Sequence, residues 1–258
     1  MTHTKGAFPY WPDGVPKEIS GYDKPIYSFL DEAARKYPDQ VYTIFQGAKR
    51  TYAQVKRDAD KVAAFLKSRG IGKGDRVAIF LPNLPHYPVI YFGILKAGAV
   101  CVTCNPMYTA SELQHQLNDS GAKMVFCMDH QQFYPTAVQA MQDTQAKTAV
   151  LCSVKNWIPK VSGVIGSLAG KIPKAGKYEQ GHVHLDEILR TTDPVEENVE
   201  VDPWQDPAVL IYTGGTTGLP KGAVLTHANM VSDVLMVQEW IRISHGPGEP
   251  VRTPIEGG

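Results

Sequence analysis

The sequence predicts an α/β fold in which β-α-β units stack around a mainly parallel sheet. Short, almost continuously apolar runs alternate with stretches whose apolar residues recur at helical spacing. Continuous apolar runs are typical of parallel strands that helices cover on both faces. Glycines close several of the helical stretches, as at helix C-termini. Because such sheets bind ligands beyond the carboxyl ends of their strands, we expect the site there.

The elements follow one another in this alternating order. The first predicted helix covers 54–68, where Val55, Val62 and Leu66 share one face. Thr109 and Glu112 have the spacing of a capping box at the start of another helix. The remaining predicted helices cover 85–97, 109–118, 131–142, 185–190 and 227–241. The predicted strands cover 76–81, 99–103, 123–127, 148–152, 209–212 and 222–226.

Composition divides the chain into an arm, two lobes and a tail. Residues 1–25 predict an irregular N-terminal arm, and 26–206 predict the first α/β lobe. Within that lobe, 154–184 interrupts the alternation and forms an insertion. Residues 207–243 begin a second lobe, and the polar, Pro/Gly-rich 244–258 predict a disordered tail.

Charge and cysteine usage exclude several functions. The 26 Lys and Arg residues balance 26 Asp and Glu residues, so no electrostatic footprint for nucleic acid is present. The N-terminus lacks an apolar signal core, which predicts a cytoplasmic protein. Cys101 and Cys104 form a C-x-x-C, but without a second such pair or a nearby His pair we expect buried apolar residues instead of a metal site.

The most informative segment is Tyr212–Gly222, which is rich in Gly and Thr and contains Lys221. Apolar runs at 208–211 and 223–225 flank it as strands, which predicts a hairpin. Glycine lets backbone N–H groups turn toward an anion, while hydroxyls and an ammonium group suit phosphate. A polar surface hairpin without a ligand is the alternative interpretation.

Two common phosphate loops are excluded by spacing. A Walker A loop needs Gly before its lysine and Ser or Thr after it, whereas Pro220 precedes Lys221 and Gly222 follows. The run Gly70–Gly74 is the nearest approach to a dinucleotide fingerprint. It fails the spacing and precedes a strand, so it predicts a helix-ending turn.

The loop, together with Thr226-His227 and Asn229, closely resembles the signature of AMP-forming acyl-CoA synthetases. That superfamily also includes luciferases and the adenylation domains of peptide synthetases. The resemblance extends over about 26–243. The upstream segments similar to core motifs of the family are Thr51–Val55, Gly74–Ile79, Leu81–Asn83, Leu95–Val100 and Asn105-Pro106.

The resemblance implies ATP-dependent activation of a carboxylate, with Mg²⁺ as metal and coenzyme A as co-substrate. Lys221 would neutralise phosphate charge and act in catalysis together with Thr216, and Thr213 would lie near the Mg²⁺. Loop glycines would supply backbone N–H groups. The residues expected to bind ATP are Thr213, Gly214, Gly215, Thr216, Thr217, Gly218 and Lys221.

The resemblance also implies an incomplete N-terminal domain, because the later family motifs for adenine, ribose and the catalytic C-terminal lysine are missing. We therefore expect the isolated chain to be inactive. Alternatives are a non-catalytic remnant that binds nucleotide or a partner, and an adenylating enzyme with another acceptor. The insertion is similar to those of long-chain fatty-acid ligases, which favours a fatty-acid substrate.

The sequence also predicts further partners and the environment of three histidines. The apolar segment 157–172 has lysines and Trp157 as anchors for peripheral contact with the inner face of the membrane, or else it packs as a loop. A homodimer is a further candidate state. His182 and His184 are expected to be solvated, and His227 to be structural in the first turn of its helix.

Overall fold

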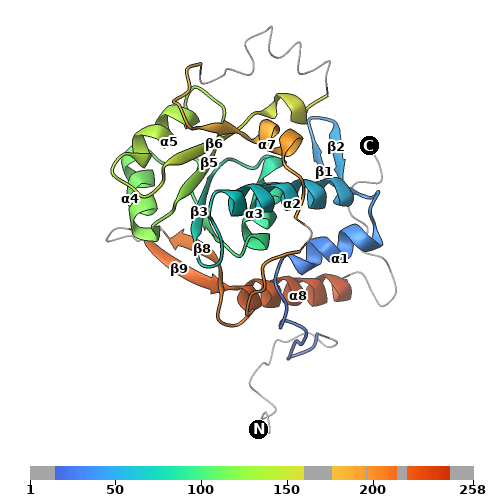
Figure 1. The fold of residues 1–258 in the computed structure, drawn as a ribbon. Helices are drawn as coiled ribbons and strands as arrows, with labels where there is room; N and C mark the ends of the chain where they lie inside the picture. Colours follow the sequence, from blue (N-terminus) through green and yellow to red (C-terminus); the bar gives the residue numbers. More distant parts are fainter. Residues whose placement is uncertain (1–14, 160–175, 196, 214–219, 245–258) are drawn as a thin grey trace.

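The computed structural model describes residues 15–159, 176–195, 197–213 and 220–244. The tail beyond Ser244, most of the arm and most of the insertion lie outside the described residues. A central twisted sheet has helices on both faces (Figure 1). The predicted α/β fold with a mainly parallel sheet is confirmed.

The main sheet has the strand order β7-β6-β5-β3-β4-β8-β9 in the described part of the chain. All neighbours run parallel except β8 and β9, which pair antiparallel. The strands are β3 (Arg76–Phe80), β4 (Val100–Thr103), β5 (Met124–Met128), β6 (Thr148–Cys152), β7 (Val183–His184), β8 (Pro207–Thr213) and β9 (Lys221–Thr226).

Helices cover the two faces as two separate cores. One core includes residues of α1, α2, α3, α7 and α8, and the other includes residues of α4 and α5. The helices are α1 (Ser28–Lys36), α2 (Tyr52–Ser68), α3 (His86–Lys96), α4 (Ala110–Ser120), α5 (Phe133–Met141), α7 (Leu185–Thr191) and α8 (His227–Ser244), with a 3₁₀ turn η1 (Val154–Trp157).

The predicted capping box at the start of α4 is confirmed. The Thr109 hydroxyl accepts from the Glu112 N–H, and the Glu112 carboxylate accepts from the Thr109 N–H, which completes the capping box. Gly121 ends α4 with φ of 63°, a left-handed conformation that glycine adopts without steric cost. A second capping box, Thr51 with Gln54, starts α2, and its T-x-x-Q spacing was a readable signal.

The sequence interpretation missed the first helix and a small hairpin. The α1 helix buries Leu30 and Ala34 on one face. The strands β1 (Val41–Phe45) and β2 (Ala48–Thr51) pair antiparallel. Their two-residue turn has positive φ at both Gln46 and Gly47. Asn-Gly and Asp-Gly usually fill such a turn, so Gln-Gly gave little signal.

A buried lysine joins three helices on the first face. Lys96 at the end of α3 is 1% exposed and forms ion pairs with Asp31 of α1 and Asp60 of α2. Lys56 also pairs with Asp60, at 2.7 Å between Nζ and Oδ2. A buried charge requires such partners, so these contacts fix the relative positions of α1, α2 and α3.

The cysteines are buried and unbonded to one another, as the sequence predicts. Burial raises the pKa of the Cys127 thiol to about 12, and it raises the pKa of Cys101 and Cys104 as well. Among the described residues, no group of three or more His, Cys, Asp or Glu could hold a metal ion.

The prediction that Trp157 anchors a membrane contact is wrong for this side chain. Trp157 is 4% exposed, and its ring lies 4.1 Å from the His86 ring and 4.0 Å from the Arg50 guanidinium carbon. Its apolar area is therefore already buried inside the protein. None of the described helices combines the length and the hydropathy needed to cross a membrane.

Candidate functional site

The candidate site is built on the antiparallel hairpin of β8 and β9, which confirms the predicted hairpin. Thr213 at the end of β8 pairs with Lys221 at the start of β9, and both residues are exposed. The Thr213 hydroxyl donates to the Lys221 carbonyl at 3.5 Å. The structure thus brings two predicted site residues together. The others, Gly214, Gly215, Thr216, Thr217 and Gly218, lie outside the described residues.

Tyr212 holds this end of the hairpin against α4. Its hydroxyl donates to the Asp119 carboxylate at 2.6 Å. Burial and the Asp119 charge raise the pKa of Tyr212, so the hydroxyl stays protonated and remains a donor. The Tyr212 ring also lies over Gly222, where an added Cβ would come within 3.0 Å of the ring. Gly222 therefore permits the ring to cross the neighbouring strand.

A cavity of about 450 Å³ lies beside the hairpin, beyond the carboxyl end of β4. From β3 the chain continues through α3 into one core, whereas from β4 it continues through α4 into the other. Ligands of open α/β sheets bind where successive connections leave toward opposite faces, so the cavity has the expected location. Its lining residues are Thr103, Cys104, Asn105, Tyr108, Glu112, Tyr212 and Pro220.

The polar groups around this cavity are held in place by local hydrogen bonds. Hydrogen bonds from Thr109 lower the pKa of Glu112, which keeps its carboxylate ionised. The Asn105 side chain accepts from the Met107 N–H at 3.0 Å. The Thr103 hydroxyl donates to the Leu210 carbonyl at 3.3 Å and so links β4 to β8. The cavity wall is therefore set before any ligand arrives.

The sequence interpretation did not assign these wall residues to the site. Asn105 lies in a segment similar to a core motif, and Tyr212 is the first residue of the signature segment. The sequence could therefore have indicated both as site residues. No sequence pattern indicates Asp119, because its role depends on a contact with Tyr212, which is 93 residues away in the chain.

The other end of the hairpin leads directly into α8 and His227. The Thr226 hydroxyl accepts from the Asn229 N–H, and the Asn229 side chain accepts from the Thr226 N–H, which caps the helix. His227 is 1% exposed, and its Nδ1 accepts from the Ile26 N–H at 3.3 Å. Burial lowers the pKa of His227 to about 4, partly opposed by Asp206. These contacts agree with the expected structural role.

The expectation of solvated histidines is met only in part, because His182 and His184 are both half-buried. His182 Nδ1 lies 3.0 Å from the Tyr134 hydroxyl, and burial lowers the pKa of this histidine. His184 packs edge-on against Tyr178, with 4.9 Å between the ring centroids. Aromatic neighbours outside the local sequence thus cover both side chains in part.

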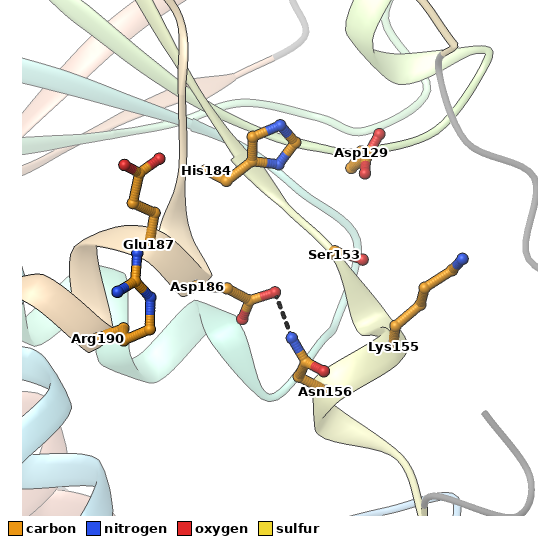
Figure 2. A pocket seen from close by; sticks show the side chains of 8 residues that line it. All are labelled: Asp129, Ser153, Lys155, Asn156, His184, Asp186, Glu187 and Arg190. Carbon is orange, nitrogen blue, oxygen red and sulfur yellow. Dashed lines mark hydrogen bonds between the residues drawn. The ribbon is translucent and has the colours of Figure 1, made fainter. Parts of the chain in front are cut away.

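A second hollow of about 610 Å³ lies at the carboxyl ends of β5 and β6. Figure 2 shows the side chains that line it. Its side chains pair with one another and with nearby groups. Asp186 accepts from Asn156 at 2.9 Å and from Trp157 at 3.4 Å, and Asp129 accepts from Tyr178 at 2.7 Å. Its lining contains both acidic and basic side chains, and it includes no glycine or threonine of the kind that the hairpin segment contains.

Comparison with known proteins identifies the family. The family described as AMP-binding enzyme matches residues 30–251. A long-chain-fatty-acid–CoA ligase of Bacillus subtilis (strain 168) is 34% identical over 241 residues, which are 90% of this chain and 41% of that protein. The chain spans about two fifths of the length of the curated relatives it matches.

Solved structures agree on the fold. A long-chain-fatty-acid-CoA ligase from Archaeoglobus fulgidus superposes with a TM-score of 0.66 at 24% identity, over 88% of this chain and 41% of that one. An anthranilate CoA ligase in complex with anthranoyl-AMP gives a TM-score of 0.67 at 20% identity, over 81% and 36%. By its fold, its signature hairpin and the family match, the chain belongs to the AMP-binding enzymes.

Proposed function

We propose that this site serves the ATP-dependent activation of a long-chain fatty acid to acyl-AMP and then to acyl-CoA. The observation that carries the proposal is the pairing of Thr213 with Lys221 beside the switch-point cavity, with the Gly/Thr-rich segment between them. The names of the curated relatives support the substrate class.

The chemistry explains why a phosphate site is needed. A carboxylate has a poor leaving group, so a thiol cannot displace it directly. In the first step, a carboxylate oxygen attacks the α-phosphorus of ATP, and the bond to the departing pyrophosphate breaks. In the second step, the thiol of coenzyme A attacks the acyl carbon, releases AMP and loses its proton. Donors and cations that hold the phosphates in line lower the first barrier.

Each loop residue then has a defined role. Lys221 neutralises charge that builds on the leaving pyrophosphate, and Thr216 and Thr217 donate hydroxyl hydrogen bonds to phosphate oxygens. The glycines give the backbone its freedom to direct N–H groups at the anion. These glycines are Gly214, Gly215 and Gly218.

Mg²⁺ fits this site only together with phosphates. Thr213 offers one exposed hydroxyl oxygen, and the described residues hold no cluster of three metal-ligating side chains. Mg²⁺ usually keeps several waters and takes further oxygens from bound phosphates, so one protein oxygen is compatible with it. When bound, the ion would neutralise phosphate charge.

The finer assignments belong to the same proposal. They are a cytoplasmic location with peripheral membrane contact through 157–172 in which Trp157 is not an anchor, a homodimer, and the domain divisions at 26–206 and 207–243. The alternatives are a nucleotide-binding or interaction module without catalysis, and adenylation with a different acceptor. The two alternatives are distinguished by nucleotide binding, by ATP–pyrophosphate exchange and by acyl-CoA formation.

The test is ATP–pyrophosphate exchange with palmitate. We expect none from the 258-residue chain by itself. We expect exchange when the whole chain is joined to the part of the B. subtilis ligase that it does not span. Lys221→Ala should slow that exchange at least about 100-fold, as removal of a charge-stabilising donor does. Palmitate binding should change little.

Lys123→Ala is the matched control, because Lys123 is a partly exposed lysine that pairs with Asp75 at the amino end of the strands. This control should keep the exchange rate. Exchange unchanged by Lys221→Ala would contradict the role of Lys221. Acyl-hydroxamate trapping without acyl-CoA formation would favour another acceptor, and nucleotide binding without exchange in the fusion would favour the module.

A further inference from the structure

A separate cavity of about 400 Å³ lies between α1, α2 and the segment that follows α7. The Val195 N–H donates to the Asp60 carbonyl at 3.3 Å, which holds that segment against α2. In the described part of the chain, this cavity and the cavity beside the hairpin share no lining residue. The lining residues are Asp31, Ala34, Arg35, Ala53, Lys56, Arg57, Asp60, Pro194 and Val195.

The two carboxylates of this cavity already have protein partners. Asp60 binds Lys96 through Oδ1 at 2.6 Å and Lys56 through Oδ2 at 2.7 Å. Asp31 binds Lys96 through Oδ1, and its Oδ2 accepts from the Asn198 side chain at 3.0 Å. Each of the four carboxylate oxygens therefore has a donor, and the two acids do not need a cation from outside the protein.

The two guanidinium groups of the cavity lack comparable partners. Among the described residues, no hydrogen bond or ion pair holds the Arg35 side chain. The Arg57 side chain is 60% exposed, and its Nε lies 4.0 Å from Asp58 Oδ1. Asp58 is itself paired closely with Arg50. Arg35 and Arg57 are therefore available to an anionic ligand.

The ionised side chains give the cavity a positive charge. Its lining contains three cationic and two anionic side chains. The ammonium group of Lys96, which is bonded to both carboxylates, adds a fourth positive charge. Four positive and two negative charges leave a net charge of +2, in a chain whose formal net charge is zero. A phosphate monoester carries a charge of about −2 near pH 7, so it complements this cavity.

We propose that this cavity, the α1–α2 cavity, is a binding site for a phosphate monoester, with Arg35 and Arg57 holding the phosphate. A guanidinium group donates parallel hydrogen bonds to phosphate oxygens, and two such groups match the three terminal oxygens of the ester. Ala34, Ala53 and Pro194 supply an apolar surface for the organic part. The volume lies within the range of small-molecule sites, roughly 300–1,000 Å³.

The inference goes beyond the proposed catalysis, because the signature segment contributes no residue to the α1–α2 cavity. A ligand held by Arg35 of α1 and Arg57 of α2 would link the two helices, so its binding should stabilise the folded chain. A soluble ester and the headgroup of phosphatidic acid both present this chemical group. The experiment therefore uses one probe of each kind.

The first measurement is isothermal titration of the 258-residue chain with glycerol 3-phosphate, for which we expect saturable binding at one site. Arg35→Gln and Arg57→Gln should each weaken binding about 10- to 100-fold, as the loss of a hydrogen bond to a charged group does. Arg69→Gln is the matched control. It removes the same charge from an exposed arginine directly after α2, whose guanidinium carbon lies 5.1 Å from the Phe65 ring centre, and it should bind as the unmodified chain does.

The folding of the variants is checked by the Tm without ligand, which should match that of the unmodified chain. With saturating glycerol 3-phosphate, the Tm should rise for the unmodified chain and for Arg69→Gln, and much less for the two cavity variants. An equal loss of affinity in Arg69→Gln would mean that binding follows total charge, which would overturn the proposal.

The signature segment is itself expected to bind phosphate, so Lys221→Ala is the second control. This variant should keep its affinity for glycerol 3-phosphate. Loss of binding in Lys221→Ala, with full binding in Arg35→Gln, would assign the ligand to the hairpin and overturn the proposal. Binding at the α1–α2 cavity without ATP–pyrophosphate exchange in the fusion would contradict the proposed function and leave this site standing.

The remaining arms test the class and the source of the ligand. Acetate at the same concentration should not displace glycerol 3-phosphate, and displacement would assign the cavity to carboxylates and overturn the proposal. Flotation with phosphatidic acid vesicles, compared with phosphatidylglycerol vesicles that carry only a phosphate diester, tests the lipid source. Binding that depends on Arg35 and Arg57 supports the proposal with either probe and identifies the source. No saturable binding to either probe would overturn it.

Discussion

Acid should destabilise this protein through two buried neutral histidines. His227 and His86 are at most 1% exposed, and burial lowers the pKa of each to about 4, against an ordinary value of 6.5. His227 Nδ1 accepts a hydrogen bond from the Ile26 N–H, so its protonation would set two donors against each other. His86 directs Nε2 at the Ser153 carbonyl.

The sign and size of the effect follow from linkage. The unfolded chain binds protons at these histidines below about pH 6.5, whereas the folded chain binds them only below about pH 4. The free energy of unfolding therefore decreases as the pH falls from about 6.5 to about 4. Each histidine should cost about 2 kcal/mol of unfolding free energy between pH 7 and pH 5. Both together should cost about 4 kcal/mol, a large share of a typical domain's stability.

Guanidinium denaturation at pH 7 and pH 5 measures this loss. Burial raises the pKa of Asp58, which acts in the opposite direction, so the difference between variants is the informative quantity. His227→Asn keeps an acceptor for the Ile26 N–H but does not titrate, and its pH-dependent loss should be smaller by about 2 kcal/mol. Val231→Ala changes a buried residue of the same helix that does not titrate, so this variant should show the full loss of unfolding free energy between pH 7 and pH 5. An equal loss in wild type and His227→Asn would refute the reasoning.

Three further substitutions test packing and the site. Lys96→Met should destabilise the fold by about 3 kcal/mol, because it leaves Asp60 buried with only Lys56 as a partner. Full stability in a denaturant titration would contradict that account. Gly93→Ala should cost about 2 kcal/mol in the same assay, since its Cβ would lie 2.6 Å from Val62; a cost near zero would mean that α2 and α3 can separate freely. Tyr212→Phe removes the hydrogen bond to Asp119 and should cost about 1–2 kcal/mol. It should also slow palmitate-dependent ATP–pyrophosphate exchange in the fusion with the B. subtilis portion. An unaltered rate would mean that the hydrogen bond between Tyr212 and Asp119 does not position the loop.

The parallel core was predictable because each of its signals is local. The strand at 148–152 and the capping box at Thr109 depend on residues within one element, and both appear as expected. The β1–β2 hairpin was missed because its turn uses Gln46, an uncommon residue at positive φ. The burial of Trp157 and the partial cover of His182 were not predicted. Their partners Arg50 and Tyr134 are distant in sequence, and composition alone cannot indicate such pairs.

In the candidate site, too, local residue patterns were predictable and contacts between distant residues were not. Residue types in the Tyr212–Gly222 segment indicate phosphate chemistry, but they do not say what directs the loop. The structure fixes the hairpin at both ends. Near the loop, Tyr212 bonds to Asp119 of α4 on one face of the sheet. At the far end, His227 bonds to the Ile26 backbone, which leads into α1 on the other face.

These two anchors make the orientation of the loop depend on both cores of the domain. Because the His227 anchor requires a neutral imidazole, acid should loosen the far end of the hairpin while the Tyr212 anchor remains protonated and intact. Hydrogen exchange should therefore rise at the Ile26 amide before it rises in β8 as the pH falls from 7 toward 5, after correction for the intrinsic rates. Simultaneous exposure of both segments would mean that the hairpin opens only with the whole fold, and that the two anchors act as one cooperative unit.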